Sequence, residues 1–79
     1  MTKEELKIKI GQSIKETRVD MKLSQASVAE TLGITPTAYC MKESGKNNFS
    51  VWELGSLMNI LVISDEEMGE IIYHEHGQN

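Results

Sequence analysis

Apolar residues recur along the chain at intervals of three and four positions, which is the spacing of one face of an α-helix. The pattern predicts five helices and no strands. We expect helices over residues 3–21, 25–32 and 36–44, then two that open at Ser50 and Ser64, followed by a frayed tail over residues 74–79. The expected inward positions are Leu6, Ile10, Ile14, Thr17, Val28, Ala29, Leu32, Val51, Leu54, Leu57, Met58, Leu61, Met68, Ile71 and Ile72.

Capping residues indicate where these helices begin. Ser24 precedes the second helix, and Thr35 precedes the third, in which Pro36 takes the first helical position without losing a hydrogen bond. Ser50–Glu53 and Ser64–Glu67 both have the form of a capping box, in which each side chain satisfies the other residue's backbone N–H.

The segment LSQASVAETLGITPTAYCMKESG, residues 23–45, carries the strongest organisational signal. Gly33 supplies the positive φ that a tight turn between two short helices needs. Ala29, four residues earlier, is small at the point where the two helices would cross. This layout is typical of a helix-turn-helix, whose second helix normally enters the major groove of DNA.

Length and composition limit the possible organisation. With 79 residues, 39% of them hydrophobic, the chain is expected to form one domain over residues 1–79, for which dimerisation is a source of extra stability. Its single cysteine excludes an internal disulfide. The charged start and the lack of a membrane-length apolar run predict a cytoplasmic protein without a membrane span.

Charge is distributed unevenly along the chain. The formal net charge of −4 argues by itself against nucleic-acid binding. However, residues 1–50 carry all eight Lys and Arg against six acids, whereas residues 51–79 carry six acids and no Lys or Arg. The first part suits a DNA-facing surface, while the acidic last third suits either a protein partner or simple solubility.

Four segments, IGQSIKETR, LSQASVAETLGIT, ESGKNN and ISDEEM, together resemble the phage Cro and lambda-type repressor family of helix-turn-helix domains. The resemblance covers about residues 10–68. It implies an all-α, compact, four- or five-helix lambda-repressor-like DNA-binding domain that binds an operator as a dimer. It also implies a structural ion pair between Arg18 and Glu43, tying the first helix to the third.

The third helix and its surroundings hold the expected DNA contacts. Base edges would be met by the first two turns, at Pro36, Thr37, Ala38 and Met41, and phosphates by Lys42, Lys46, Asn47 and Asn48. Gln25 would bind a phosphate or brace the recognition helix. Each of these residues has an ordinary alternative as a solvated surface side chain, or for Met41 as a core residue. Lys42 would either lay its stem over the core and extend its ammonium to water, or face phosphate in a rotated helix with Met41 inward.

Catalysis and metal binding find little support. The two histidines of His74-Glu75-His76 are two positions apart and face different ways on a helix, and Cys40 has no nucleophile partner nearby in the sequence. We therefore expect no enzyme activity, metal or cofactor. The expected dimer surface consists of Trp52, Ile71, Ile72 and Tyr73, although Ile71 and Ile72 would alternatively close the core of the monomer.

Two function classes remain. The first is a sequence-specific transcriptional regulator that binds a pseudo-palindromic operator in double-stranded DNA as a dimer. Within it, a small phage or prophage Cro-like repressor is favoured over a restriction–modification controller or an antitoxin. The second is a protein-interaction module, such as an antirepressor or an antitoxin-like partner binder, that keeps the fold and has lost DNA binding. The acidic last third and the poorly polar recognition helix favour the second class, whereas Gln25 and the loop after Gly45 favour the first.

Overall fold

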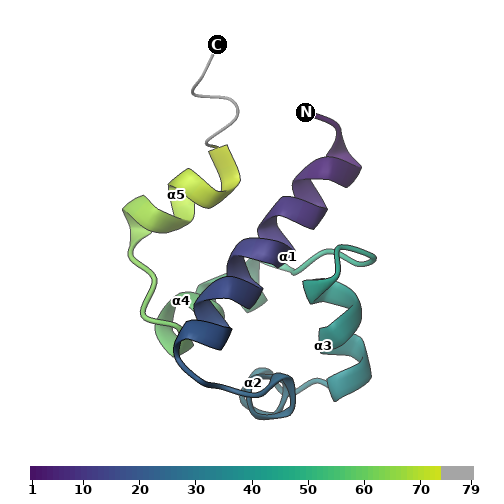
Figure 1. The fold of residues 1–79 in the computed structure, drawn as a ribbon, viewed down its shortest axis with the longest axis vertical. Helices are drawn as coiled ribbons and strands as arrows, with labels where there is room; N and C mark the ends of the chain where they lie inside the picture. The colour runs from purple at the N-terminus through teal and green to yellow at the C-terminus, as the bar shows by residue number, and fades with distance from the viewer. Residues whose placement is uncertain (74–79) are drawn as a thin grey trace.

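The computed structural model describes residues 1–73, and this part of the chain contains five helices and no strand (Figure 1). The all-helical prediction is therefore confirmed. The helices are α1 (Lys3–Asp20), α2 (Gln25–Leu32), α3 (Pro36–Glu43), α4 (Val51–Ile60) and α5 (Asp65–Tyr73). The expected frayed tail and the His74-Glu75-His76 segment lie outside the described residues. Within residues 1–73, no helix is both long and apolar enough to cross a membrane.

The expected caps are present at the helix starts. Ser24 Oγ accepts from the N–H of Ser27, and Thr35 Oγ1 accepts from the N–H of Ala38 at 3.1 Å. Both expected capping boxes form, at the starts of α4 and α5. A further box, in which Thr2 and Glu5 satisfy each other, opens α1 and was not foreseen.

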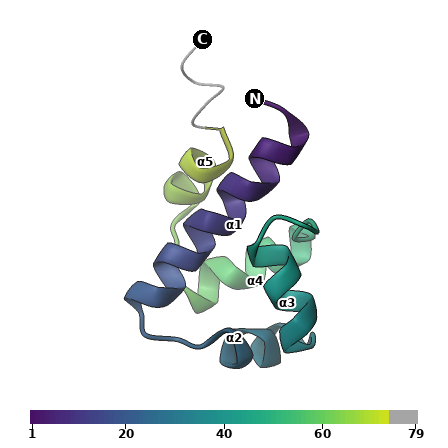
Figure 2. The ribbon, with the colours of Figure 1, turned by 45° about the vertical axis from the view of Figure 1, so that its right-hand side comes forward.

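The core lies where α1 crosses the other helices. Helix α4 lies behind α1 in Figure 1 and is seen between α1 and α3 in Figure 2. Helices α5 and α3 both contact α1 and lie on opposite sides of it in Figure 1, and α2 lies at the far end of the molecule. The fully buried side chains include Tyr39, Ile14, Leu57 and Val28. Gly11 marks the closest approach of α1 to α3, since a Cβ there would meet the backbone carbonyl oxygen of Glu43.

Some expected inward positions differ from the structure. Val51 was expected in the core, but 88% of its surface is exposed, because it lies off the face of α4 that carries Leu57 and Leu61. Helix α1 ends at Asp20, one residue earlier than expected. Thr17, also expected to face inward, is only partly buried. The same holds for six of the expected apolar core residues, namely Leu6, Ile10, Leu54, Met58, Ile71 and Ile72.

Every helix-to-helix connection uses the same chain reversal. A left-handed residue follows each of the first four helices, at Lys22, Gly33, Gly45 and Val62, with φ between 53° and 86°. In each case the next N–H donates to the carbonyl five residues earlier, as Ile63 does to Met58 at 2.8 Å. This is the Schellman arrangement, which prefers glycine at the left-handed position. Lys22 and Val62 are the two non-glycine exceptions.

Candidate nucleic-acid interface

Helices α2 and α3 are in contact and are joined by a tight turn at the residues where the sequence predicts one. Gly33 takes the left-handed conformation (φ 75°) after α2, and Thr35 starts α3 two residues later. Ala29 is fully buried, which lets the two helices cross closely. The inner face of α3 is formed by Tyr39 and Glu43, both buried.

A buried hydrogen-bond network holds this inner face, centred on the carboxylate of Glu43. Arg18 donates to it through Nε at 2.8 Å and Nη2 at 3.0 Å, so the expected ion pair between α1 and α3 is present and bidentate. Gln25 Nε2 donates to it at 2.9 Å and Tyr39 Oη at 2.6 Å. Side chains from three helices therefore meet at one carboxylate, and Gln25 braces α3.

Protonation equilibria in the network favour the charged pair. Burial by itself would raise the pKa of Glu43, but the hydrogen bonds from Arg18, Tyr39 and Gln25 outweigh it, so the pKa lies below the ordinary value of 4.5. Burial, and next the carboxylate of Glu43, raise the pKa of Tyr39, which keeps its hydroxyl protonated as a donor. Among the described residues, no buried side-chain nitrogen or oxygen lacks a hydrogen-bond partner.

Lys42 belongs to a second ion pair that the sequence analysis did not find. Its Nζ lies 2.8 Å from Oε1 of Glu53 and donates to the carbonyl of Asn48 at 3.1 Å. The same oxygen of Glu53 accepts from the N–H of Ser50 as part of the capping box. The structure differs from both alternatives for Lys42, because its ammonium is bound at the carboxylate of Glu53, whereas the first alternative placed it in water and the second placed it outward at phosphate. The ammonium of Lys42 is therefore engaged within the protein.

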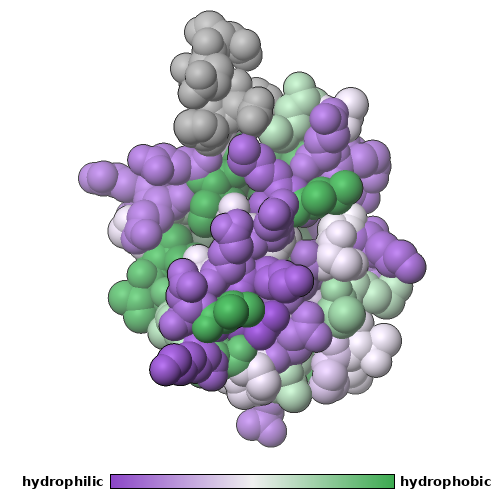
Figure 3. Space-filling model, in the orientation of Figure 1, coloured by the Kyte–Doolittle hydropathy of each residue, from purple (hydrophilic) through white to green (hydrophobic). Residues whose placement is uncertain are grey.

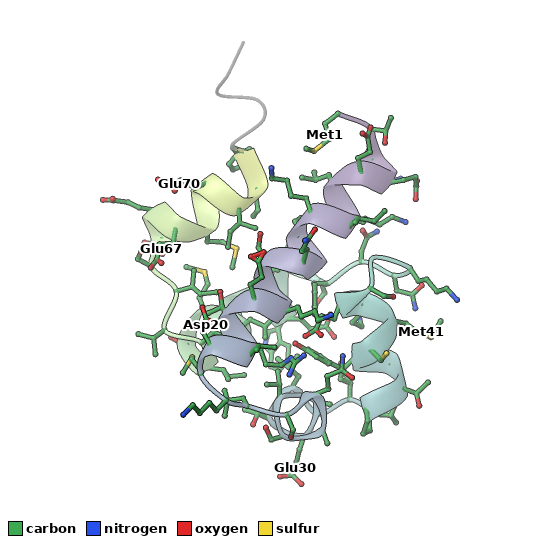
Figure 4. All side chains as sticks on the ribbon, viewed as in Figure 1. Met1, Asp20, Glu30, Met41, Glu67 and Glu70 are labelled. Atoms are coloured by element: carbon green, nitrogen blue, oxygen red, sulfur yellow. The ribbon has the colours of Figure 1, made fainter. Side chains whose placement is uncertain are left out.

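The outer face of α3 is exposed and carries no charge. Pro36, Thr37 and Cys40 are exposed, and Met41 points outward with 37% of its surface accessible (Figure 4). Ala38 is half-buried. In the space-filling view, the atoms over α3 are mostly pale, between the hydrophilic and hydrophobic extremes (Figure 3). This face therefore offers apolar contacts and one threonine hydroxyl.

Polar side chains follow α3 in the turn before α4. Lys46, Asn47 and Asn48 are all exposed there. Backbone bonds from the N–H groups of Lys46 and Asn47 to the carbonyl of Met41 fix this turn against the end of the helix. The structure thus places one ammonium and two amide side chains beside the outer face of α3.

The residues expected at a dimer surface lie on two different helices. Trp52 is 67% exposed on the first turn of α4, and Tyr73 is 64% exposed at the end of α5. Ile71 and Ile72 are partly buried and pack against the core, which is the alternative that the sequence left open for them. The two isoleucines therefore add little to an outer surface.

Acidic side chains of α1 and α5 line a shallow groove. Glu16 and Asp20 come from α1, and Glu67 and Glu70 from α5 (Figure 4). Within residues 1–73, no three His, Cys, Asp or Glu side chains are arranged to hold a metal ion. Lys9 also lines this groove, which is therefore predominantly, and not wholly, acidic on the side of α1 that packs against α5.

Comparison of the chain with protein-family models, with curated proteins and with solved structures found no match.

Proposed function

We propose that this chain is a sequence-specific DNA-binding regulator, a small repressor of the lambda-repressor-like, Cro type that binds a pseudo-palindromic operator as a dimer. One observation carries the proposal: α3 is fixed from behind by the buried carboxylate network of Glu43, while its outer face stays exposed. A rigid short helix with a bare outer face matches the requirement for insertion into a major groove.

In this proposal, few side chains read base edges directly. Thr37 offers a hydroxyl that donates or accepts and a methyl that suits thymine, and Met41 offers apolar contact only. Lys46, Asn47 and Asn48 bind phosphates and set the register of α3 in the groove. Because so few polar groups face the bases, much of the specificity comes from the shape and deformability of the operator.

Selection of bound sequences from random duplex DNA tests the proposal. We expect enrichment of a two-fold-symmetric site, with an affinity that falls at least tenfold between about 50 and 200 mM salt because phosphate contacts release counterions. Lys46→Ala should weaken binding to every sequence and lower the salt slope by about 1. Lys15→Ala, which removes an exposed lysine of α1, is the matched control. No enriched site, together with weak binding at low salt, would refute DNA binding.

The acidic groove between α1 and α5 favours a second candidate, a protein-interaction module of the same fold. Its four carboxylates, at Glu16, Asp20, Glu67 and Glu70, suit a basic segment of a partner protein. The two functions differ in one measurement. Neutralising Glu67 and Glu70 would leave operator affinity unchanged or raise it, but would weaken capture of a basic partner.

A further inference from the structure

The α3–α4 turn, residues 44–50, carries the side chains that the proposed function assigns to phosphates. Lys46, Asn47 and Asn48 are exposed in it, on a segment that leaves the end of α3 and returns behind α1 to the start of α4 (Figure 1). Exposed turn residues sample many conformations, so binding through them costs conformational entropy unless the backbone is already fixed. The contacts that fix this backbone therefore bear directly on how well its side chains bind.

Backbone contacts fix the first half of the α3–α4 turn. The N–H groups of Lys46 and Asn47 both donate to the carbonyl of Met41, at 2.9 and 3.2 Å. Gly45 takes a left-handed conformation (φ 86°) and lies against α1, since a Cβ at this position would be 2.8 Å from the Cα of Ile8. These contacts reach only as far along the turn as Asn47.

The second half of the turn is held by the ion pair of Lys42 with Glu53. Lys42 Nζ donates to the carbonyl of Asn48 at 3.1 Å and to Oε1 of Glu53 at 2.8 Å. The same Oε1 accepts from the N–H of Ser50 at 2.8 Å, directly before α4. One ammonium thus connects the end of α3 both to the last residues of the turn and to the first turn of α4.

The ion pair is shielded enough from solvent to act as a fixed connection. Only 18% of the side chain of Lys42 and 9% of that of Glu53 are exposed. Charge-assisted hydrogen bonds are roughly twice as strong as neutral ones, and salt screens them less when the groups are partly buried. The two charges also cancel, so the pair adds no net positive charge to attract DNA. An effect of the pair on DNA binding therefore acts through the position of the turn.

We propose that Lys42 and Glu53 are positioning residues of the α3–α4 turn. They touch no DNA, and they fix the turn relative to α3, so that the phosphate contacts of the turn and the base contacts of α3 engage at a set spacing. The role rests on the proposed function, because it requires DNA as the ligand. It gives Lys42 a different part in DNA binding from the direct phosphate contact that the sequence predicted.

The affinity of two variants for the operator that the wild type selects separates positioning from simple electrostatics. Glu53→Gln removes an acid and frees the ammonium of Lys42, so electrostatics alone would strengthen DNA binding. Positioning has the opposite sign, and we expect Glu53→Gln and Lys42→Met each to bind about tenfold more weakly than the wild type. The matched controls Glu66→Gln and Lys15→Met make the same charge changes at exposed sites of α5 and α1, and should stay within about twofold of the wild type.

Trypsin cleavage without DNA measures the order of the turn in the same variants. The peptide bond after Lys46 lies in the α3–α4 turn, and the bond after Lys22, between α1 and α2, is the internal control. Local loosening of the α3–α4 turn speeds only cleavage after Lys46, whereas global unfolding speeds cleavage at both sites. We expect the ratio of the two rates to rise about fivefold in Lys42→Met and in Glu53→Gln.

The outcomes distinguish this role from the proposed function. If the wild type binds DNA and Glu53→Gln binds equally well or better, the role is overturned and the regulator stands. Stronger binding by Glu53→Gln together with weaker binding by Lys42→Met would make Lys42 a direct phosphate contact instead. Weaker binding with an equal rise of cleavage at both sites also overturns the role, because the variants then act through global stability. A wild-type chain that selects no DNA refutes the regulator and this role together.

Discussion

Replacing Gly11 by alanine should separate α1 from α3 and destabilise the whole domain. The added Cβ would lie 2.1 Å from the carbonyl oxygen of Glu43 and 2.8 Å from its carbonyl carbon. Both are backbone atoms, so no side-chain rotation relieves the conflict. Ordinary contact at 3.4–4 Å requires the two helices to move apart by roughly 1 Å.

The size of the effect follows from what that movement breaks. The hydrogen bonds of Arg18 to Glu43, at 2.8 and 3.0 Å, would lengthen beyond bonding distance. Overpacking costs about 1–3 kcal/mol and disruption of a buried ion pair about 3–5 kcal/mol, against a gain of up to about 1 kcal/mol from replacing a helical glycine. We therefore expect a net loss of about 3–7 kcal/mol, which is comparable to the whole stability of a domain of this size.

Urea denaturation followed by helical circular dichroism measures this loss. Gly69→Ala is the control, because a Cβ at Gly69 meets nothing within 4 Å and the substitution should stabilise α5 by about 0.5–1 kcal/mol. The same glycine-to-alanine change is thus expected to lower the free energy of unfolding at Gly11 and to raise it at Gly69. Equal free energies of unfolding for the two variants would refute the close approach at Gly11.

Three further changes test other features of the structure. Val62→Asn should raise the free energy of unfolding by about 1 kcal/mol, measured in dilute solution, because asparagine tolerates the left-handed backbone; a loss of stability would contradict this. Glu43→Gln should cost about 3 kcal/mol, since it leaves Arg18 buried without a counter-charge. Because folding lowers the pKa of Glu43, its contribution to the stability of the wild type should be fully present above the ordinary value of 4.5 and should be lost as the pH drops through the lower folded-state pKa. If the Glu43→Gln variant loses as much stability in acid as the wild type does, Glu43 is not the source of that loss. Lys42→Met should cost about 2 kcal/mol in thermal or urea unfolding by removing a charged donor from Glu53, and an unchanged midpoint would show that the pair contributes nothing.

The helix starts could be predicted because capping is local. Each cap at Ser24, Thr35, Ser50 and Ser64 joins groups only three residues apart, so the residue types in a short window determine it. The left-handed turn at Gly33 was predictable for the same reason. The resemblance added the pairing of Arg18 with Glu43, which spans 25 residues and which no local pattern would reveal.

The remaining contacts of the candidate site could not be predicted because they depend on how helices dock. Periodicity gives the direction of a residue on its helix but does not identify its partner on another helix. Glu53 was correctly assigned to a capping box, yet the lysine that shares its oxygen comes from α3. Val51 precedes the apolar Leu54 by three residues, which is helical spacing. The face of α4 that packs in the core, however, lies about 120° around the helix from Val51, so Val51 is exposed.

The repeated chain reversal between helices has a consequence for folding kinetics. Each of the four reversals closes through a hydrogen bond that spans five residues, so it forms together with the end of its helix and costs little loop-closure entropy. Helical domains dominated by such local closures fold in microseconds to milliseconds. The step expected to limit the folding rate is therefore the docking of α1 onto α3. At this junction Gly11 and the pair of Arg18 with Glu43 join segments far apart in the sequence. Substitutions at this junction are therefore expected to slow folding, while those at Val62 change mainly the unfolding rate.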